Sequence, residues 1–151
     1  MRIVLQRVSR AAVEVDGDTT GEIRTGLLAL VGVANGDTAA DGRIAASKTV
    51  GMRIFPDAAA KMNRSVVEIG GAVLVVSQFT LLGDVRKGRR PAFTAAARPE
   101  EAIPVLEAFT GAIEAEGVRV AQGRFGAHMQ VSLLNDGPVT IVFDVQDGRI
   151  R

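Results

Sequence analysis

The side chains best suited to chemistry stand first in the segment Ser77-Gln78-Phe79-Thr80-Leu81. An apolar run precedes it, so two hydroxyls and an amide are expected where a buried strand meets solvent. Thr80 is the candidate nucleophile, but a threonine hydroxyl needs an adjacent base and none stands at a workable spacing. Two interpretations therefore stay open, a reacting Thr80 and a Thr80 that only positions the substrate. A third is an ordinary strand end whose hydroxyls bond to local backbone.

A second segment, Asn135-Asp136-Gly137-Pro138-Val139-Thr140, is rich in residues that favour turns. On composition alone it predicts a hairpin turn between two strands. The proline isomer is left open by the sequence, because about 5–6% of X-Pro bonds in folded proteins are cis.

Positive charge is concentrated in the run Arg86-Lys87-Gly88-Arg89-Arg90, although the net charge of the chain is only +1. Arginine and lysine give nucleic acids affinity through phosphates without reading sequence. The run therefore indicates either a phosphate-binding loop or a solvated charged loop.

Two residue counts exclude several kinds of site. The chain has no cysteine and a single histidine, His128. Disulfides and thiolate metal sites are excluded, and a Ser-His-Asp triad or a zinc site would depend on His128 alone. We therefore predict that no metal and no organic cofactor is required. His128 itself is interpreted as a surface or interface residue at the start of a strand.

Length and composition indicate one soluble domain spanning residues 1–151. Hydrophobic residues make up 47% of the chain and charged residues 23%. No apolar stretch has the length of a signal peptide core or a membrane span. We expect a cytoplasmic protein with no membrane partner.

The elements that must position these segments follow from hydrophobic periodicity and turn residues. A capping box at Thr38 and Asp41 predicts a helix to about Val50, and Pro99 predicts a second helix ending at Gly117. Residues 79–98 are expected to form a long loop, and Gly70-Gly71 to turn a hairpin. Strands are expected at residues 3–8, 13–16, 19–23, 26–33, 53–55, 66–69, 72–77, 118–122, 129–134 and 139–145. The sum is an α+β fold, a compact and mostly antiparallel, barrel-like sheet with two helices.

Taken in order, these segments resemble the D-aminoacyl-tRNA deacylase family over nearly the whole chain. Residues 77–81 are similar to its SQxxL-type motif, and residues 135–140 to its Gly-cisPro motif. Further likeness is found at residues 2–8, 13–17, 26–32, 53–55, 61–63, 86–91 and 123–127. The chain departs from the family at Leu82-Gly83 and Val85, which puts some loop contacts in doubt and leaves both motifs intact. It departs again at His128, where the family more often has an aspartate.

The resemblance implies an enzyme that hydrolyses the ester of D-aminoacyl-tRNA and so proofreads chirality in translation. It implies a homodimer in which Gly137 and Pro138 of one subunit enter the partner's active site. Their carbonyls would hold the substrate's α-amino group, so that L-substrates are rejected sterically, while glycyl-tRNA mischarged on tRNA-Ala would pass.

The same resemblance implies roles for the other residues. Ser77, Gln78, Phe79 and Thr80 would form the catalytic segment, with backbone N–H groups near Phe79 and Thr80 stabilising an oxyanion. The substrate's own 2′-hydroxyl would assist water. The tRNA would be bound by the basic residues Arg86, Lys87, Arg89 and Arg90.

Three rival interpretations belong to other classes. An RNA-binding module without hydrolysis is disfavoured by the lack of tryptophan and tyrosine, because such modules stack bases on aromatic residues. A sister deacylase would have a trans Gly-Pro bond and accept an L-substrate. A synthetase editing domain would come with a synthetase segment, which this sequence does not show.

Overall fold

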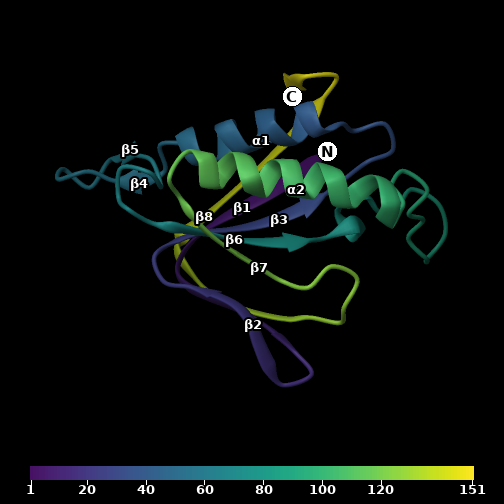
Figure 1. Cartoon of the computed structure of the whole chain (residues 1–151), viewed down its shortest axis with the longest axis horizontal. Coiled ribbons are helices and arrows are strands. Elements are labelled where there is room, and N and C mark those ends of the chain that lie inside the picture. Colours follow the sequence, from purple (N-terminus) through teal and green to yellow (C-terminus); the bar gives the residue numbers. More distant parts are fainter.

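The structure, a computed structural model, describes residues 1–151. It contains two long helices, one short 3-10 helix and nine strands (Figure 1). In chain order these are β1 (Arg2–Val15), β2 (Asp18–Ile23), β3 (Gly26–Gly32), α1 (Ala39–Gly51), β4 (Phe55–Pro56), β5 (Met62–Arg64), β6 (Ala72–Ser77), η1 (Phe79–Leu82), α2 (Pro99–Ala115), β7 (Arg119–Gln122), β8 (Gln130–Gln146) and β9 (Arg149–Ile150).

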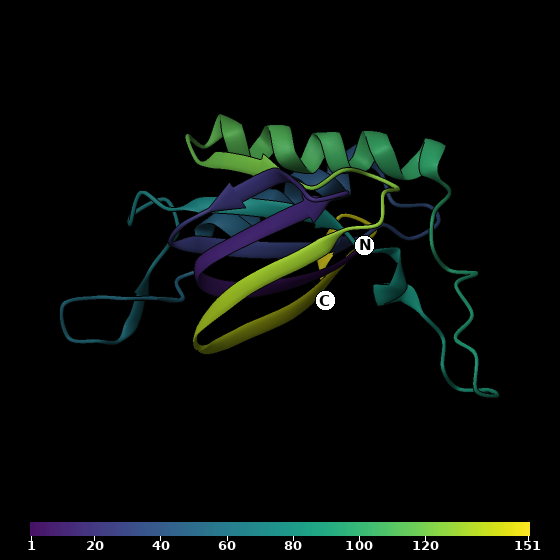
Figure 2. The same cartoon turned by 90° about the horizontal axis from the view of Figure 1, so that it is seen from below.

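The main sheet has the strand order β7-β6-β3-β1-β8-β9, and β2 also pairs with β1. β1 runs antiparallel to β2, β3 and β8, whereas β6 runs parallel to both β3 and β7. The sheet curls, and α1 and α2 lie side by side across one face of it (Figures 1 and 2). The α+β class with two helices and a barrel-like sheet is therefore confirmed. Neither helix is long and apolar enough to cross a bilayer.

A change of phase in β1 divides the core between the two faces of the sheet. Ile3 and Leu5 pack under the helices with Phe109, whereas Val8 and Val13 belong to a second buried cluster on the other face. The pairing of β1 with β8 shifts register on both sides of Val8. Such irregularities re-aim the side chains that follow, so one strand serves both clusters.

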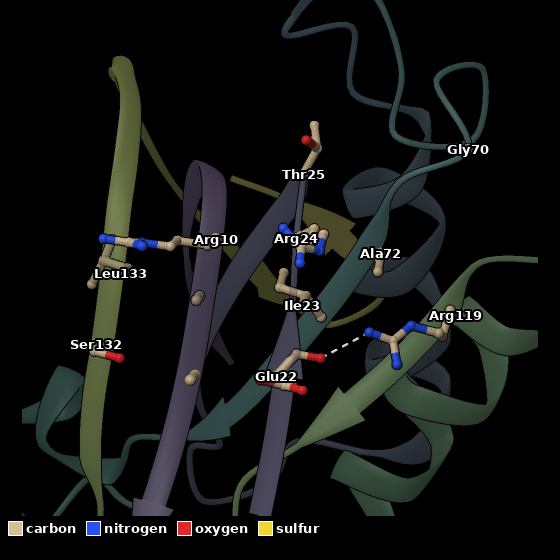
Figure 3. A pocket seen from close by; sticks show the side chains of 12 residues that line it. Arg10, Glu22, Ile23, Arg24, Thr25, Gly70, Ala72, Arg119, Ser132 and Leu133 are labelled. Atoms are coloured by element: carbon tan, nitrogen blue, oxygen red, sulfur yellow. Dashed lines mark hydrogen bonds between the residues drawn. The ribbon is translucent and has the colours of Figure 1, made fainter. Parts of the chain in front are cut away.

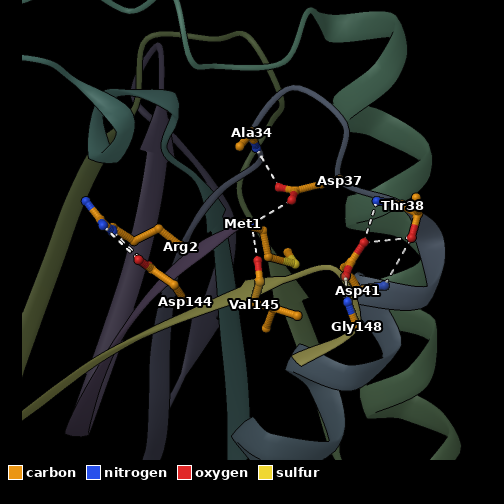
Figure 4. A network of polar contacts seen from close by, with 9 residues as sticks. All are labelled: Met1, Arg2, Ala34, Asp37, Thr38, Asp41, Asp144, Val145 and Gly148. Carbon is orange, nitrogen blue, oxygen red and sulfur yellow. Dashed lines mark hydrogen bonds and ion pairs between the residues drawn. The ribbon is translucent and has the colours of Figure 1, made fainter. Parts of the chain in front are cut away.

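Both helices begin as the sequence predicts. Thr38 caps α1 in a full capping box with Asp41, and Pro99 opens α2 with two glutamates in its first turn. Around the start of α1 a polar network ties together both ends of the chain (Figure 4). The buried Met1 ammonium donates to Asp37 at 2.7 Å and to the carbonyl of Val145 at 2.6 Å, and the Gly148 N–H donates to Asp41 at 2.9 Å.

The hairpin predicted at Gly70-Gly71 is wrong. Residues 66–69 form turns, closed by hydrogen bonds between Ser65 and Glu68 and from the Gly71 N–H to the carbonyl of Val66. β6 then enters the sheet parallel to β3 and has no hairpin partner. The short strand expected at residues 53–55 begins only at Phe55.

The hairpin turn predicted at residues 135–140 is also wrong. β8 continues through this segment and pairs with β1 on both sides of it, Asn135 with Val8 and Thr140 with Gln6. Residues 136–139 therefore lie opposite the single residue Arg7 and form a bulge, which we call the Gly-Pro loop. The Gly137-Pro138 peptide bond is cis, as the family resemblance implied.

Candidate active site

A cavity of about 450 Å³ opens where β6 ends, and we call it the site cavity. It lies among the end of β6, the loop leading into α2, the first turn of that helix and the segment before β8. Its wall is mostly apolar, with Arg98 as its one charged residue. The lining residues are Val33, Ser77, Phe79, Phe93, Ala96, Ala97, Arg98, Pro99, Ala102, Phe125, Gly126, Ala127 and Met129.

The predicted catalytic segment lies at the mouth of this cavity. Ser77 is the last residue of β6, and the Gln78 N–H donates to the carbonyl of Val31 at 2.8 Å, which extends the pairing with β3 by one bond. The chain then turns into η1, whose first two N–H groups belong to Phe79 and Thr80 and have no partner inside the helix. Gln78 and Thr80 do not line the cavity themselves.

The side chains of Gln78 and Thr80 are bonded to each other. The Gln78 amide donates to Thr80 Oγ1 at 2.5 Å, and both groups are open to solvent. No carboxylate or imidazole is bonded to the Thr80 hydroxyl. His128, the only histidine, is exposed and lines neither this cavity nor the one beside it. Nowhere do three His, Asp or Glu side chains gather as a metal site would require.

Aromatic rings form much of the wall of the site cavity, and the motifs of the sequence include Phe79 and the segment of Phe125 but not Phe93. The rings of Phe79 and Phe93 meet edge to face with their centroids 5.1 Å apart, and Phe79 remains 55% exposed. Phe125 completes the wall and also lines a smaller neighbouring cavity of about 170 Å³, which it shares with Ser77. Because Phe79 and Phe125 are exposed together at one cavity, they belong to a contiguous apolar surface of the kind that marks a binding site. In the sequence, Phe93 looks like an ordinary core residue.

The basic loop, residues 86–90, projects from the end of the molecule at which η1 lies (Figure 2), and Phe79 of η1 lines the site cavity. Its base is closed by two backbone hydrogen bonds between Asp84 and Ala92. Arg86 is held back on this base, because its guanidinium donates twice to the Asp84 carboxylate. These bonds lower the pKa of Asp84 below its ordinary value. Lys87, Arg89 and Arg90 are exposed and make no ion pair.

The Gly-Pro loop is held in place by a buried arginine of the neighbouring strand β1. Arg7 is only 9% exposed, and its Nε donates to the carbonyl of Asp136 at 2.9 Å while its Nη1 donates to the carbonyl of Ile54 at 2.6 Å. At the neck of the loop, Asn135 accepts a hydrogen bond from the Val139 N–H and donates one to Thr140. Gly137 and Pro138 themselves are exposed.

Within one chain the two motifs do not meet. Gly137 and Pro138 line neither cavity, and two strands, β3 and β1, lie between β6 and β8 in the sheet. Strands stand about 4.8 Å apart, so three spacings put roughly 14 Å between the backbones of β6 and β8. A cavity next to Ser77 thus has no access to its own Gly-Pro loop.

The fold is of the α+β class, with a curled sheet and an open cavity at the end of its central strand β6. Comparison with known proteins identifies the family. A family model described as D-Tyr-tRNA(Tyr) deacylase matches residues 4–144. The chain belongs to this family of ester hydrolases, and the resemblance deduced from the motifs is confirmed.

Relatives described as D-aminoacyl-tRNA deacylases match this chain over almost their entire length. A D-aminoacyl-tRNA deacylase of Anaeromyxobacter dehalogenans is 60% identical, and the match covers 95% of this chain and 97% of the relative. One from Chloroflexus aurantiacus is 55% identical, covering 99% and 94%.

Among solved structures, one described as a c-Myc DNA unwinding element binding protein has a TM-score of 0.89 and 36% identity. The match covers 97% of this chain and 99% of the chain in that structure. A probable eukaryotic D-amino acid tRNA deacylase has a TM-score of 0.81, with 95% and 98% covered. At 20% identity it supports the fold alone.

Proposed function

We propose that this protein hydrolyses the ester bond of D-aminoacyl-tRNA as a homodimer, releasing the D-amino acid and free tRNA. Family membership supports the reaction. The observation that carries the quaternary arrangement is the position of the Gly-Pro loop, which is exposed, rigidly held by Arg7 and remote from the cavity of its own chain.

The exposed edge of β8 offers the surface for dimer formation. Beyond its pairing with β1, β8 has a partner only at its end, where Val145 and Gln146 meet β9. Leu134 and Val142 on this strand are 52% and 59% exposed. An unpaired strand edge with exposed apolar side chains favours association with another chain. A second copy that covers this edge also receives the adjoining Gly-Pro loop.

In the dimer, the carbonyls of Gly137 and Pro138 accept hydrogen bonds from the substrate's α-ammonium group in the partner's cavity. A D-residue held in this way directs its side chain away from the wall, whereas the side chain of an L-residue collides with it. Selectivity then rests on exclusion by main-chain atoms. Glycine has no side chain to exclude, so glycyl-tRNA mischarged on tRNA-Ala is accepted as well.

For the chemical step, water adds to the ester carbonyl and the N–H groups of Phe79 and Thr80 stabilise the oxyanion. Each such donor is worth roughly 10²–10³ in rate in other enzymes. The bond to the ribose oxygen then breaks, and that oxygen takes up a proton. Thr80 positions the substrate together with Gln78, because its hydroxyl is bonded to an amide and not to a base. Ser77 shapes the pocket, and the substrate's 2′-hydroxyl assists the water.

The basic loop contributes affinity for the tRNA. Lys87, Arg89 and Arg90 contact phosphates near the 3′ end, while Arg86 secures the base of the loop through Asp84. Replacing Arg89 and Arg90 with alanine lowers the salt dependence of tRNA binding in this account, and an unchanged salt slope contradicts it.

Subunit complementation tests the shared site directly. Gly137→Ala disables the loop, and Ser77→Phe fills the site cavity. Each homodimer should keep no more than about a hundredth of wild-type activity on D-tyrosyl-tRNA. Mixed dimers combine one intact loop with one intact cavity, so refolding the two variants together should restore about a quarter of wild-type activity, since half of the dimers are mixed and each has one of two sites. A site built within one chain gives no recovery.

Chirality is tested with the wild-type enzyme alone. D-tyrosyl-tRNA should be hydrolysed and L-tyrosyl-tRNA spared at the same enzyme concentration. Equal rates on both esters contradict the exclusion mechanism, and no hydrolysis of either contradicts the proposed function as a whole.

A further inference from the structure

A larger cavity, of about 790 Å³, lies at the opposite end of the sheet from the site cavity. It is lined by residues of β1, β2, β6, β7 and β8, by the connection from β2 to β3 and by Gly70 (Figure 3). Three arginines stand along it, Arg10 on β1, Arg24 after β2 and Arg119 on β7, and we call them the arginine row. None of them belongs to the motifs that define the family site.

The three arginines form a line across the strands. In Figure 3, Arg119 reaches toward β2, Arg24 lies over the same strand, and Arg10 extends toward Leu133 on β8. Arg119 is fixed in this direction, because its guanidinium donates to the carbonyl of Glu22 at 2.8 Å. β2 lies directly against the end of β7, where a Cβ on Gly21 would stand 2.5 Å from the carbonyl oxygen of Gln122.

The row carries a surplus of positive charge. Glu22 is the only acidic residue that lines the cavity, and none of the four ion pairs of the chain involves Glu22 or any of the three arginines. All three arginines are exposed. Three guanidinium groups against one carboxylate attract an anion, and the guanidinium fork matches phosphate oxygens in particular.

The lining favours a phosphate backbone over a free nucleotide. Not one of the 12 lining residues is aromatic, so a base finds no ring on which to stack. Strands stand about 4.8 Å apart, so cations carried on several strands are spread over roughly 10–15 Å. A line of cations suits successive phosphates along a strand better than the single cluster of one nucleotide.

We propose that the arginine row is a second tRNA-binding surface, which contacts phosphates of the tRNA body beyond the 3′ end. This inference rests on the proposed function for the identity of the nucleic acid. β6 connects the two sites, from Ala72 in the large cavity to Ser77 in the site cavity. Five residues of strand span roughly 16 Å, a distance that one tRNA covers.

The test removes charge from two arginines whose side chains make no hydrogen bond in the structure. Arg10→Gln with Arg24→Gln takes two charges from the row and leaves Arg119 and its bond to Glu22 in place. The matched control, Lys48→Gln with Arg149→Gln, removes two exposed charges from α1 and β9. Binding of uncharged tRNA is measured at several salt concentrations, with thermal unfolding as a check on both variants.

The row variant should bind uncharged tRNA roughly tenfold more weakly at low salt, with the slope of log K against log salt reduced by about 2, while the control stays at wild type. On full-length D-aminoacyl-tRNA, kcat/KM should fall by the same factor with kcat unchanged. A D-aminoacyl ester of the 3′-terminal trinucleotide, which lacks the tRNA body, should be hydrolysed at the wild-type rate.

Wild-type tRNA affinity and salt slope in the row variant overturn the proposal. So does a variant that loses only ATP or inorganic phosphate binding, which would assign the cavity to a free ligand. Failure of the proposed function is seen separately, because the wild-type enzyme would then leave both esters intact, whereas the binding slope still reports on the row.

Discussion

The segment at residues 77–80 and the Gly-Pro loop supply the two halves of the site, but the fold holds them in different ways. The first continues a buried strand between β3 and β7 and is positioned by sheet pairing, with its own side chains largely free. The second is an insertion in a strand with one open edge, and it is held by a side chain, Arg7, from the neighbouring strand. The comparison predicts that shortening an exposed side chain of the first region, such as Thr80, costs little activity, whereas small changes in the second displace the loop.

The largest effect is expected from Gly137→Ala. Gly137 has φ +142°, and an added Cβ would stand 2.7 Å from Val139 Cγ2 and 2.8 Å from the Val139 nitrogen. The loop must shift, and a displacement of about 1 Å can cost roughly a hundredfold in rate. We expect kcat/KM on D-tyrosyl-tRNA to fall by about that factor.

Gly17→Ala is the control for this change. Gly17 also has a positive φ, +87°, but nothing lies within 4 Å of its added Cβ. It should cost about 1–2 kcal/mol of stability and leave activity intact. Equal activity losses in both variants would show that backbone strain, and not loop position, is responsible.

Arg7→Lys tests whether one side chain holds the loop. A lysine keeps the charge but cannot donate to the carbonyls of both Asp136 and Ile54 as the guanidinium does. One buried acceptor is left without its charged donor, which costs about 1–3 kcal/mol in urea unfolding. Activity should fall roughly tenfold, with the smaller loop displacement reducing the preference for D over L.

Arg2→Lys provides the matched comparison. Arg2 donates to Asp144 in a half-exposed pair, so the same exchange there should cost less than about 1 kcal/mol. If both variants lose the same stability and keep full chiral preference, Arg7 is only one cation among others.

The same contrast explains what the sequence predicts well. The predicted cap of α1 is confirmed, because it depends only on Thr38 and Asp41, which are three residues apart in the sequence. The prediction of a hairpin turn at residues 135–140 is wrong because the same residue types favour both a hairpin turn and a bulge. The outcome is decided by pairing with β1, about 130 residues earlier in the chain. The Gly70-Gly71 hairpin fails for the same reason, since the partners of β6 are distant strands.

The site follows the same division. Ser77 and Thr80 attract notice because hydroxyls close an apolar run, and Gly137 and Pro138 because of the family motif. Phe93, Arg98 and Met129 also line the cavity, but single apolar or basic residues in loops carry no local signal. Their role is seen only in the folded chain, which brings four separate segments together around the cavity.

Thr80→Ala should have a small effect on activity. It removes the hydrogen bond from Gln78 but leaves the N–H groups of η1 in place. A fall in kcat of less than about tenfold is expected if Thr80 only positions the substrate. A burst of acyl-enzyme in the wild type, absent in Thr80→Ala and retained in Thr80→Ser, would instead identify Thr80 as the nucleophile.

The smallest effect on catalysis is expected from Asp41→Asn, which lies in neither region. Asp41 is 4% exposed, and its carboxylate accepts hydrogen bonds from the Thr38 hydroxyl at 2.7 Å, the Thr38 N–H at 2.9 Å and the Gly148 N–H at 2.9 Å. These bonds, the Thr38 side chain first, lower the pKa of Asp41 below its ordinary value of 3.8. At pH 7 the variant should lose about 1 kcal/mol of stability, as a lost cap does, with kcat on D-tyrosyl-tRNA unchanged.

The sign of the pH dependence follows from the lowered pKa. A depressed carboxyl pKa stabilises the folded state above the unfolded value of 3.8, and this contribution is lost as the pH falls through the lower folded value. The difference in unfolding free energy between wild type and Asp41→Asn should therefore be constant from about pH 7 to pH 5 and shrink below 3.8. A difference that persists unchanged in acid would mean that the ionised carboxylate contributes nothing beyond its shape. A loss of kcat at pH 7 would mean that the helix network reaches the site, and the division between the two regions and the rest of the fold would fail.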